Sequence, residues 1–318
     1  MSRQLNTPVL FLVFNRPETT RQVFETIRQA RPPRLYIAAD GPRDDKPGEQ
    51  VVCEKVRAVA TAVDWPCEVW TLFREKNLGC GVAVSGGVDW FFEREPEGII
   101  LEDDCLPEQS FFRFCEELLE RYRTEPSVMM ISGGFYLGEQ YKIAGNYFFS
   151  KHVDTWGWAS WRRAWRYNDP KITPWPSLRD SDWLMRIGNG HSDFGEFWTE
   201  VFDTVHGGRV DIWDYQWVFS CWVQNGLSIV PSRNLVKNIG FGDDATHTKS
   251  DGGHLSTQPL EAISFPLEHP DAIKRDHVAD RWIDLIVYGT MNAPVYRRIL
   301  RKIPGLRRVV REMRSFVS

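Results

Sequence analysis

The sequence lacks several patterns that would place it in a familiar functional class. Its six cysteines include no Cys-x-x-Cys pair, which speaks against a structural zinc site, and a chain of 318 residues does not need disulfides to hold its core. No apolar run reaches the length of a membrane span, and residues 9–14 are too few for a signal peptide. We therefore expect reduced thiols and a soluble, cytoplasmic protein.

An excess of charge of one sign is also missing. The chain has 39 Lys and Arg against 43 Asp and Glu, a net charge of −4, which gives no general attraction to nucleic acid, and we expect no nucleic-acid partner. Tryptophan, in contrast, is abundant, with fourteen residues. This side chain packs in cores and also stacks against sugar rings or bases, and core packing is the commoner role for any one of them.

Apolar runs alternate with segments of helical spacing in the first third of the chain. The runs cover residues 8–14, 35–39, 67–73 and 98–101, and the helical segments between them cover residues 18–28, 50–63 and 78–93. This β-α-β order predicts an α/β fold with a mostly parallel sheet flanked by helices. A helix over residues 110–123 and a strand over residues 128–132 are expected next, followed by a Trp-rich half with shorter elements.

The expected strands end in polar and charged side chains. These are Asn15 and Arg16 after the first, Asp40 after the second, Arg74 and Asn77 after the third, and Glu102, Asp103 and Asp104 after the fourth. Because ligands of open α/β sheets bind beyond the carboxyl ends of the strands, we expect these groups to share one edge. The glycine-rich turn of a dinucleotide-binding fold is absent after the first strand, and a P-loop is absent as well.

Three consecutive carboxylates follow the fourth expected strand. Buried carboxylates lose hydration and repel one another, so they are costly without a cation. Oxygen ligands suit Mg²⁺ or Mn²⁺, which usually complete their coordination with substrate phosphates. The sequence thus predicts a site for a divalent metal and a nucleotide diphosphate at Glu102, Asp103 and Asp104, and a solvated acidic turn is the alternative.

On these residues the first half resembles the GT-A nucleotide-diphospho-sugar transferases. The likeness is to N-acetylglucosaminyltransferase I and its bacterial relatives, which carry a Glu-Asp-Asp version of the DXD motif. Residues 11–17 resemble that family's first strand with its base-contacting Arg, here Arg16, and Asp40 stands where the family has a uracil-binding Asp. Residues 99–104, with the segment that follows them, resemble the metal-binding strand.

The second half continues the resemblance, which covers roughly residues 7 to 250. Residues 155–161 resemble an acceptor-side segment, in which Trp156, Trp158 and Trp161 are candidates for an acceptor platform, although core packing is the expected role for at least two of them. Residues 212–217 resemble the segment with the catalytic base. This chain has Asp-Tyr where the relative has Asp-Asp, and its residues 73–81 differ in length, which leaves the donor sugar open.

The resemblance implies a role for each candidate side chain. Asp104 would bind Mn²⁺ or Mg²⁺, and Glu102 and Asp103 would hold ribose or sugar hydroxyls. Arg16 and Asp40 would frame the base, and Arg74 and Asn77 belong to the donor-contacting region.

The catalytic base and a histidine in the segment after it complete the predicted site. Asp214, between aromatic residues, is the candidate base that takes the proton from the acceptor hydroxyl, and a helix N-cap is the alternative role. Asp211 and Asp154 are rival bases. His247 is the candidate to contact phosphate or metal, and an ordinary loop histidine is the other reading.

We interpret the chain as an inverting, metal-dependent glycosyltransferase. The implied donor is a UDP-sugar, for instance UDP-GlcNAc, and the implied acceptor is a hydroxyl of a glycan or lipid-linked glycan, as in polysaccharide or lipopolysaccharide biosynthesis. Residues 1–135 would form the nucleotide-sugar-binding half, residues 136–270 the acceptor-binding and catalytic half, and residues 271–318 a basic helical tail. The alternatives are a nucleotidyltransferase, whose glycine- and Lys/Arg-rich loop is absent here, and a non-catalytic sugar-binding protein.

The C-terminal segment combines basic and apolar residues at helical spacing. Between residues 297 and 314 it has eight Lys and Arg against one Glu. Such a helix can lie on an anionic membrane, which would suit a lipid-linked acceptor. Packing on the domain with a solvated basic face is the alternative, so peripheral association with the inner face of the membrane through residues 294–318 is a hypothesis here.

Overall fold

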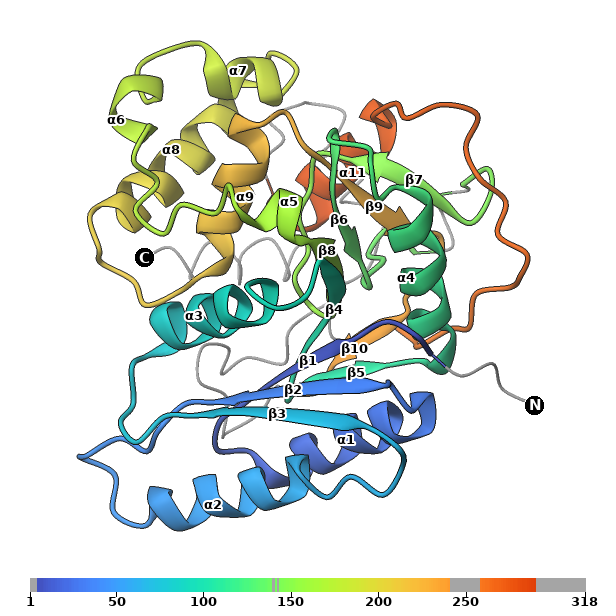
Figure 1. The fold of residues 1–318 in the computed structure, drawn as a ribbon. Helices are drawn as coiled ribbons and strands as arrows, with labels where there is room; N and C mark the ends of the chain where they lie inside the picture. The colour runs from blue at the N-terminus through green and yellow to red at the C-terminus, as the bar shows by residue number, and fades with distance from the viewer. Residues whose placement is uncertain (1–4, 139–140, 142, 241–257, 290–318) are drawn as a thin grey trace.

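A computed structural model (Figure 1) describes residues 5–138, 141, 143–240 and 258–289. Within these ranges the main element is an eight-stranded sheet with the order β3-β2-β1-β4-β8-β6-β9-β7. Six strands run in one direction, β1 (Val9–Val13), β2 (Arg34–Ala39), β3 (Glu68–Phe73), β4 (Glu97–Glu102), β6 (Val128–Ser132) and β9 (Leu227–Pro231). Strands β7 (Tyr147–Ser150) and β8 (Trp158–Trp161) run against them. The predicted α/β fold with a mostly parallel sheet is confirmed.

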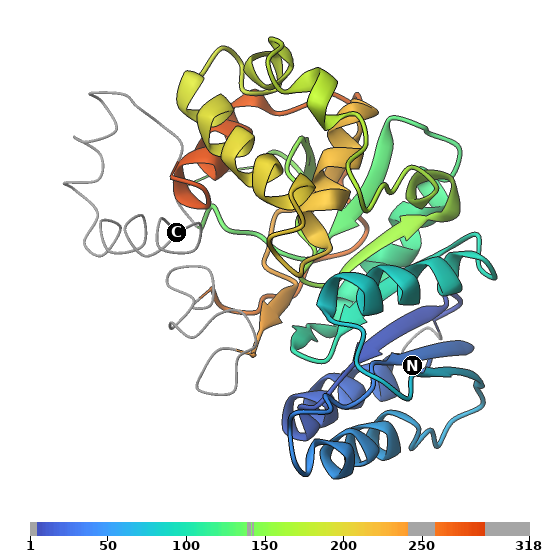
Figure 2. The ribbon, with the colours of Figure 1, turned by 90° about the vertical axis from the view of Figure 1, so that its left-hand side faces the viewer.

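Helices cover both faces of this sheet (Figure 1). One face packs against α1 (Pro17–Ala30), α2 (Glu49–Ala60) and α4 (Gln109–Arg121). The other face packs against α3 (Cys80–Phe92), α5 (Arg162–Trp165), α8 (Ser192–His206) and α9 (Asp214–Val223), with the short helices α6 (Trp175–Leu178) and α7 (Trp183–Ile187) beside α8 and α9. In the view turned by 90°, helices α1 and α2 and helices α6 to α9 lie at opposite ends of the molecule (Figure 2).

The strands β1, β2 and β4 inside the sheet are mostly apolar because they are buried on both sides, whereas the edge strand β3 is exposed. Along β1, Val9 and Phe11 belong to the core that contains α1, α2 and α4, whereas Leu10 and Leu12 belong to the core that contains α3. Successive side chains of a strand point to opposite faces, so a continuous apolar run fills both cores. The sheet edge that carries the strand ends is thereby fixed relative to both helix layers.

Tryptophan mostly packs the core of the second half. Trp158, Trp161 and Trp217 are fully buried, and Trp158 also stacks on Trp213 with ring centroids 5.8 Å apart. Two of the three candidates for an acceptor platform are therefore core residues, as expected. Trp156 remains partly accessible.

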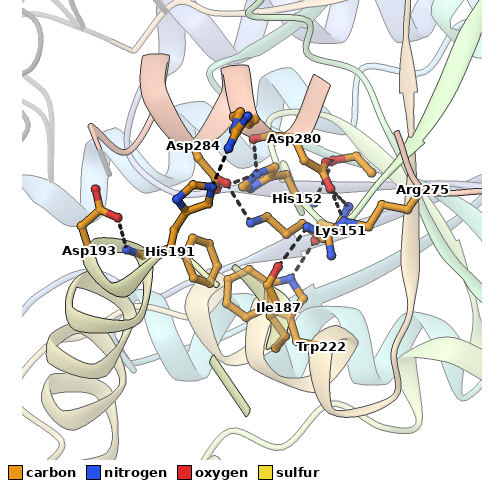
Figure 3. A network of polar contacts seen from close by, with 12 residues as sticks. Lys151, His152, Ile187, His191, Asp193, Trp222, Arg275, Asp280 and Asp284 are labelled. Atoms are coloured by element: carbon orange, nitrogen blue, oxygen red, sulfur yellow. Dashed lines mark hydrogen bonds and ion pairs between the residues drawn. The ribbon is translucent and has the colours of Figure 1, made fainter. Parts of the chain in front are cut away.

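Helix α11 (His277–Ile286) packs against β7 through a buried polar network (Figure 3). Lys151 Nζ lies 2.9 Å from Asp284 Oδ2, and His152 Nε2 lies 3.1 Å from Asp284 Oδ1. Arg275 forms an ion pair with Asp280, which is fully buried. Buried charges of this kind are stable only when paired, so the network defines how α11 docks.

Two sequence predictions fall in segments that the structure does not describe. His247 and the basic segment 294–318 both lie outside the described residues. In the part of the chain that is described, no helix is both long enough and apolar enough to cross a membrane. The roles of His247 and of the basic segment therefore stay predictions.

Candidate functional site

The acidic triplet lies where β4 leaves the sheet. Glu102 is the last residue of β4 and pairs with Leu12 of β1. Asp103 Oδ2 accepts a hydrogen bond from the backbone N–H of Phe14 at 3.0 Å, which ties the triplet to the end of β1. A short antiparallel ladder of β5 (Cys105–Pro107) and β10 (Val236–Asn238) follows directly. The predicted meeting of the first and fourth strand ends is thus present in the structure.

Arg16 reaches across to this triplet. Its Nη1 lies 2.5 Å from Asp104 Oδ2 and 3.9 Å from Asp103 Oδ1. Burial acts to lower the pKa of Arg16, but the two carboxylates outweigh burial and raise it above its ordinary value. The sequence placed Arg16 at the nucleotide base, whereas the structure brings its guanidinium onto the acidic triplet.

The triplet still has more negative charge than Arg16 can balance. Burial, and then the charges of Asp104 and Asp103, raise the pKa of Glu102 well above its usual value. Burial and the charge of Asp104 raise the pKa of Asp103 to about 7. With both pKa values raised in this way, a bound cation would favour the ionised carboxylates.

These residues fit a divalent cation that also binds phosphate. The donors are carboxylate oxygens, which suit Mg²⁺ or Mn²⁺. Across the described ranges no group of three or more His, Cys, Asp and Glu side chains is arranged to hold a metal ion. A metal at Asp104 would therefore take part of its coordination from substrate phosphates and water, which is usual for Mg²⁺.

The backbone of β10 and its following residues closes over Asp104. The N–H of Ile239 donates to the carbonyl of Asp104 at 2.7 Å. A Cβ on Gly240 would lie 2.3 Å from Asp104 Oδ2, so only glycine allows this approach. The sequence includes Gly240 in a glycine-rich segment expected to close over the donor, but it does not predict the contact with Asp104. A glycine after a short apolar segment is too common to point to a metal site.

Asp40 anchors the loop after β3. Its carboxylate accepts hydrogen bonds from Asn77 Nδ2 at 2.9 Å, from the N–H of Leu78 at 3.0 Å and from the N–H of Gly41 at 2.8 Å. Burial raises the pKa of Asp40, and these backbone donors and the charge of Arg74 oppose the rise. Asp40, Asn77 and Arg74 therefore lie together as predicted from the strand ends, and a nucleotide base would have to share the oxygens of Asp40 with this loop.

Asp211 caps the N-terminus of α3. Its two carboxylate oxygens accept hydrogen bonds from the N–H groups of Cys80 and Gly81, each at 2.8 Å. Gly79 has φ +82°, and a Cβ there would lie 2.5 Å from Asp211 Oδ2. The first N–H groups of a helix need such an acceptor, so Asp211 joins the donor-side loop to the segment before α9.

Asp214 is the first residue of α9, three residues after Asp211. The preceding Trp213 is buried and stacked on Trp158, which fixes the start of the helix. The charge of Asp214 contributes to the raised pKa of Glu102, although the two residues are more than 100 positions apart in the sequence. The same charge, after burial, raises the pKa of Tyr215.

Asp154, the third candidate base, supports an aromatic pair. It accepts hydrogen bonds from the N–H of Gly134 at 3.1 Å and of Trp156 at 3.4 Å, and also bonds the hydroxyl of Tyr136. Burial raises the pKa of Asp154 to about 6, against these hydrogen bonds. The rings of Tyr136 and Trp156 meet edge to face, with centroids 5.9 Å apart. Sequence reasoning did not find Tyr136, because its contact with Asp154 depends on tertiary structure.

Comparison with known proteins gives partial likenesses only. No protein-family model matches the chain, and no curated protein sequence matches it. Among solved structures, HddC from Yersinia pseudotuberculosis is similar at 10% identity over 49% of this chain and 77% of that one, with a TM-score of 0.30. A UDP-glucose pyrophosphorylase complexed with UDP-glucose is similar at 11% identity over 48% of this chain and 65% of that one, with a TM-score of 0.27. Mouse xyloside xylosyltransferase 1 is similar at 9% identity over 69% of this chain and 81% of that one, with a TM-score of 0.33. Likeness of this degree does not assign an activity, so the functional argument rests on the site itself.

Proposed function

We propose that this protein is an inverting glycosyltransferase that moves a sugar from a nucleotide-diphosphate donor to a hydroxyl of a glycan or glycoconjugate. The observation that supports the proposal is the acidic triplet Glu102, Asp103 and Asp104 at the carboxyl end of the parallel strand β4, where the charge of Asp214 also acts on Glu102. Metal-dependent transfer of a sugar with inversion needs carboxylates that can bind the metal and a separate carboxylate that acts as the base. The donor proposed is a UDP-sugar, on the resemblance of residues 11–17 and 99–104 to GT-A enzymes.

The charges of the site suit a diphosphate leaving group. Bound at Asp104, Mn²⁺ or Mg²⁺ would supply a Lewis acid for the departing diphosphate. Arg16, already 2.5 Å from Asp104, adds a fixed positive charge on the same side. Glu102 and Asp103 are held beside it by the sheet and by the N–H of Phe14, in position to accept hydrogen bonds from ribose or sugar hydroxyls.

Asp214, rather than Asp211, is the proposed base. Both oxygens of Asp211 already accept backbone hydrogen bonds from α3, so this carboxylate is engaged in capping the helix. Asp214 follows three residues later as the first residue of α9, and its charge is one of those that act on Glu102. In this arrangement Asp214 takes the hydroxyl proton of the acceptor as its oxygen attacks the anomeric carbon from the side opposite the diphosphate.

The test is release of nucleoside diphosphate from a panel of nucleotide sugars with Mn²⁺, followed by the pH dependence of kcat/KM for the active donor. Asp214→Asn should lower the turnover number by about 10²–10⁴-fold, while the affinity for the donor stays near that of the wild type. Asp180→Asn is the matched control, because Asp180 is an exposed carboxylate, 84% accessible, far from the triplet in sequence and outside the site. Full activity in Asp214→Asn would overturn the assignment of the base.

The same panel also tests the reaction class. Release of pyrophosphate from a nucleoside triphosphate and a sugar 1-phosphate, with no transfer from any nucleotide sugar, would identify a nucleotidyltransferase and contradict the proposal. Binding of nucleotide sugars without any turnover in the presence of a range of glycan acceptors would identify a sugar-binding protein.

A further inference from the structure

Strand β3 forms an exposed edge of the sheet. In the described part of the chain it pairs only with β2, and it lies at the end of the strand order (Figure 1). Three of its large apolar side chains are exposed, Val69 at 39%, Trp70 at 42% and Phe73 at 37%. Soluble proteins usually protect such edges with charges, proline or bulges, because the free backbone groups recruit other strands. The one charged residue within β3 is its first, Glu68, and a second charged residue, Arg74, directly follows the strand.

The hydrogen bonds to β2 show which backbone groups of β3 face outward. The N–H of Glu68 donates to Pro33 at 2.9 Å, and the N–H of Arg74 donates to Ala39 at 3.0 Å. Alternate residues of a strand direct their backbone groups to the same side. The N–H and C=O groups of Val69, Thr71 and Phe73 therefore point away from β2.

We propose that two copies of this chain associate through β3, as antiparallel strands related by a twofold axis at Thr71. In this register Thr71 faces Thr71 of the second copy, and Val69 faces Phe73 of the second copy in both directions. All three outward-facing residues then fall in hydrogen-bonded pairs, so the two sheets join into one.

The side chains of β3 match the same register. Glu68 comes opposite Arg74 of the second copy, and Trp70 comes opposite Leu72 of the second copy. These pairs alternate with the hydrogen-bonded ones, which brings their side chains closest together, and opposite charges or apolar groups facing each other stabilise a sheet. Trp70 is held for this contact, because its ring stacks on Tyr36 with centroids 6.2 Å apart.

A second copy fits this edge better than an unrelated strand for two reasons. A twofold interface must be self-complementary, and a segment with an acid at one end, a base at the other and apolar groups between meets that condition. Large apolar residues of the helices that precede and follow β3 in the sequence are also exposed, Val51 of α2 at 54% and Val82 of α3 at 58%. A contact built on one short strand is small, so we expect a dimer with a dissociation constant of about 1–100 µM rather than an obligate one.

A cysteine scan tests the register directly. Hydrogen-bonded antiparallel residues have Cα atoms about 5.5 Å apart, within the range that a disulfide spans. Full-length Thr71→Cys should therefore form an intermolecular disulfide within minutes under mild oxidation. Val69→Cys is the matched control: it stands about 13 Å from its own copy across the axis, at about 3.3 Å per residue, and should not cross-link. Equal cross-linking of the two variants, or none with Thr71→Cys, would overturn the proposal.

Sedimentation of the full chain gives an independent measurement of its oligomeric state. The protein concentration should run from about 1 to 100 µM, which spans the expected dissociation constant. Wild type should pass from monomer to dimer. Glu68→Lys should remain monomeric because it faces Arg74 with like charge, and Glu68→Lys combined with Arg74→Glu should restore the dimer. Thr71→Pro should also be monomeric, because it removes an outward N–H that no other residue bonds within the described ranges. A wild type that is monomeric throughout, or a dimer that survives in Glu68→Lys and Thr71→Pro, would refute pairing at β3.

Discussion

Replacement of Lys151 by methionine should reveal how strongly α11 is held. Met keeps most of the apolar part of the side chain but lacks Nζ, which lies 3.7 Å from the centroid of the Phe194 ring. What is lost is the ammonium group 2.9 Å from Asp284, in a pair whose side chains are only 3% and 7% exposed. Removing one partner of a buried pair leaves the other charge uncompensated and costs about 3–5 kcal/mol. That is a large part of a typical stability of about 5–15 kcal/mol.

The loss should depend on pH. In the wild type, burial acts to raise the pKa of Asp284, but His152 and Lys151 hold it below its usual value. The ionised group therefore stabilises the fold above the unfolded pKa of about 3.9, and this contribution fades as the pH falls through the lower folded value. Without Lys151, only His152 opposes the effect of burial, so the pKa of Asp284 should rise. The cost of Lys151→Met should be largest at neutral pH and should shrink toward pH 5, as the carboxyl takes up a proton.

Urea unfolding of the two proteins at pH 7.5 and pH 5 measures these differences. The double variant Lys151→Met, Asp284→Leu should lose less than the sum of the single losses, because the two groups interact directly. Arg186→Met is the matched control, since it breaks an ion pair with Asp182 in which both side chains are 68% exposed, and it should leave the midpoint unchanged. A neutral-pH loss below about 1 kcal/mol, or simple additivity in the double variant, would refute the reasoning.

Four further outcomes concern the site and its surroundings. Asp104→Ala should abolish turnover while the protein stays folded, and turnover that persists in this variant or in excess EDTA would contradict metal dependence. Gly240→Ala should lower kcat with little effect on unfolding, because its Cβ would lie 2.3 Å from Asp104 Oδ2, and an unchanged kcat would show that the segment can move aside. Asp211→Asn should raise the KM for the donor more than Asp214→Asn does, because Asp211 caps the helix beside the donor-side loop. It should also keep the acidic limb of the pH profile of kcat/KM. Loss of that limb in Asp211→Asn alone would identify Asp211 as the base. The full chain should sediment with anionic liposomes at low salt but a chain ending at Asn292 should not, and equal behaviour of the two would remove the proposed membrane contact.

Much of the scaffold was predictable because its signals are local. The apolar runs at residues 8–14 and 98–101 are long, bounded by polar residues and buried on both faces, so they identify parallel strands without further information. Chain direction in a parallel sheet then places Asp40 and the triplet at residues 102–104 at one edge, and the structure brings them there. Neither step requires knowledge of distant contacts.

What the sequence by itself determined is the order of strands and helices and the presence of acidic groups at the strand ends, because periodicity and strand direction are properties of neighbouring residues. Only the tertiary structure decided how individual side chains are used. Asp211 and Asp214 look alike in the sequence, but the N-terminus of α3, more than 100 residues earlier, takes both oxygens of Asp211. Arg16 contacts Asp104 because β1 and β4 are neighbours in the sheet. Such partners are set by the packing of distant segments, and local pattern carries no record of them.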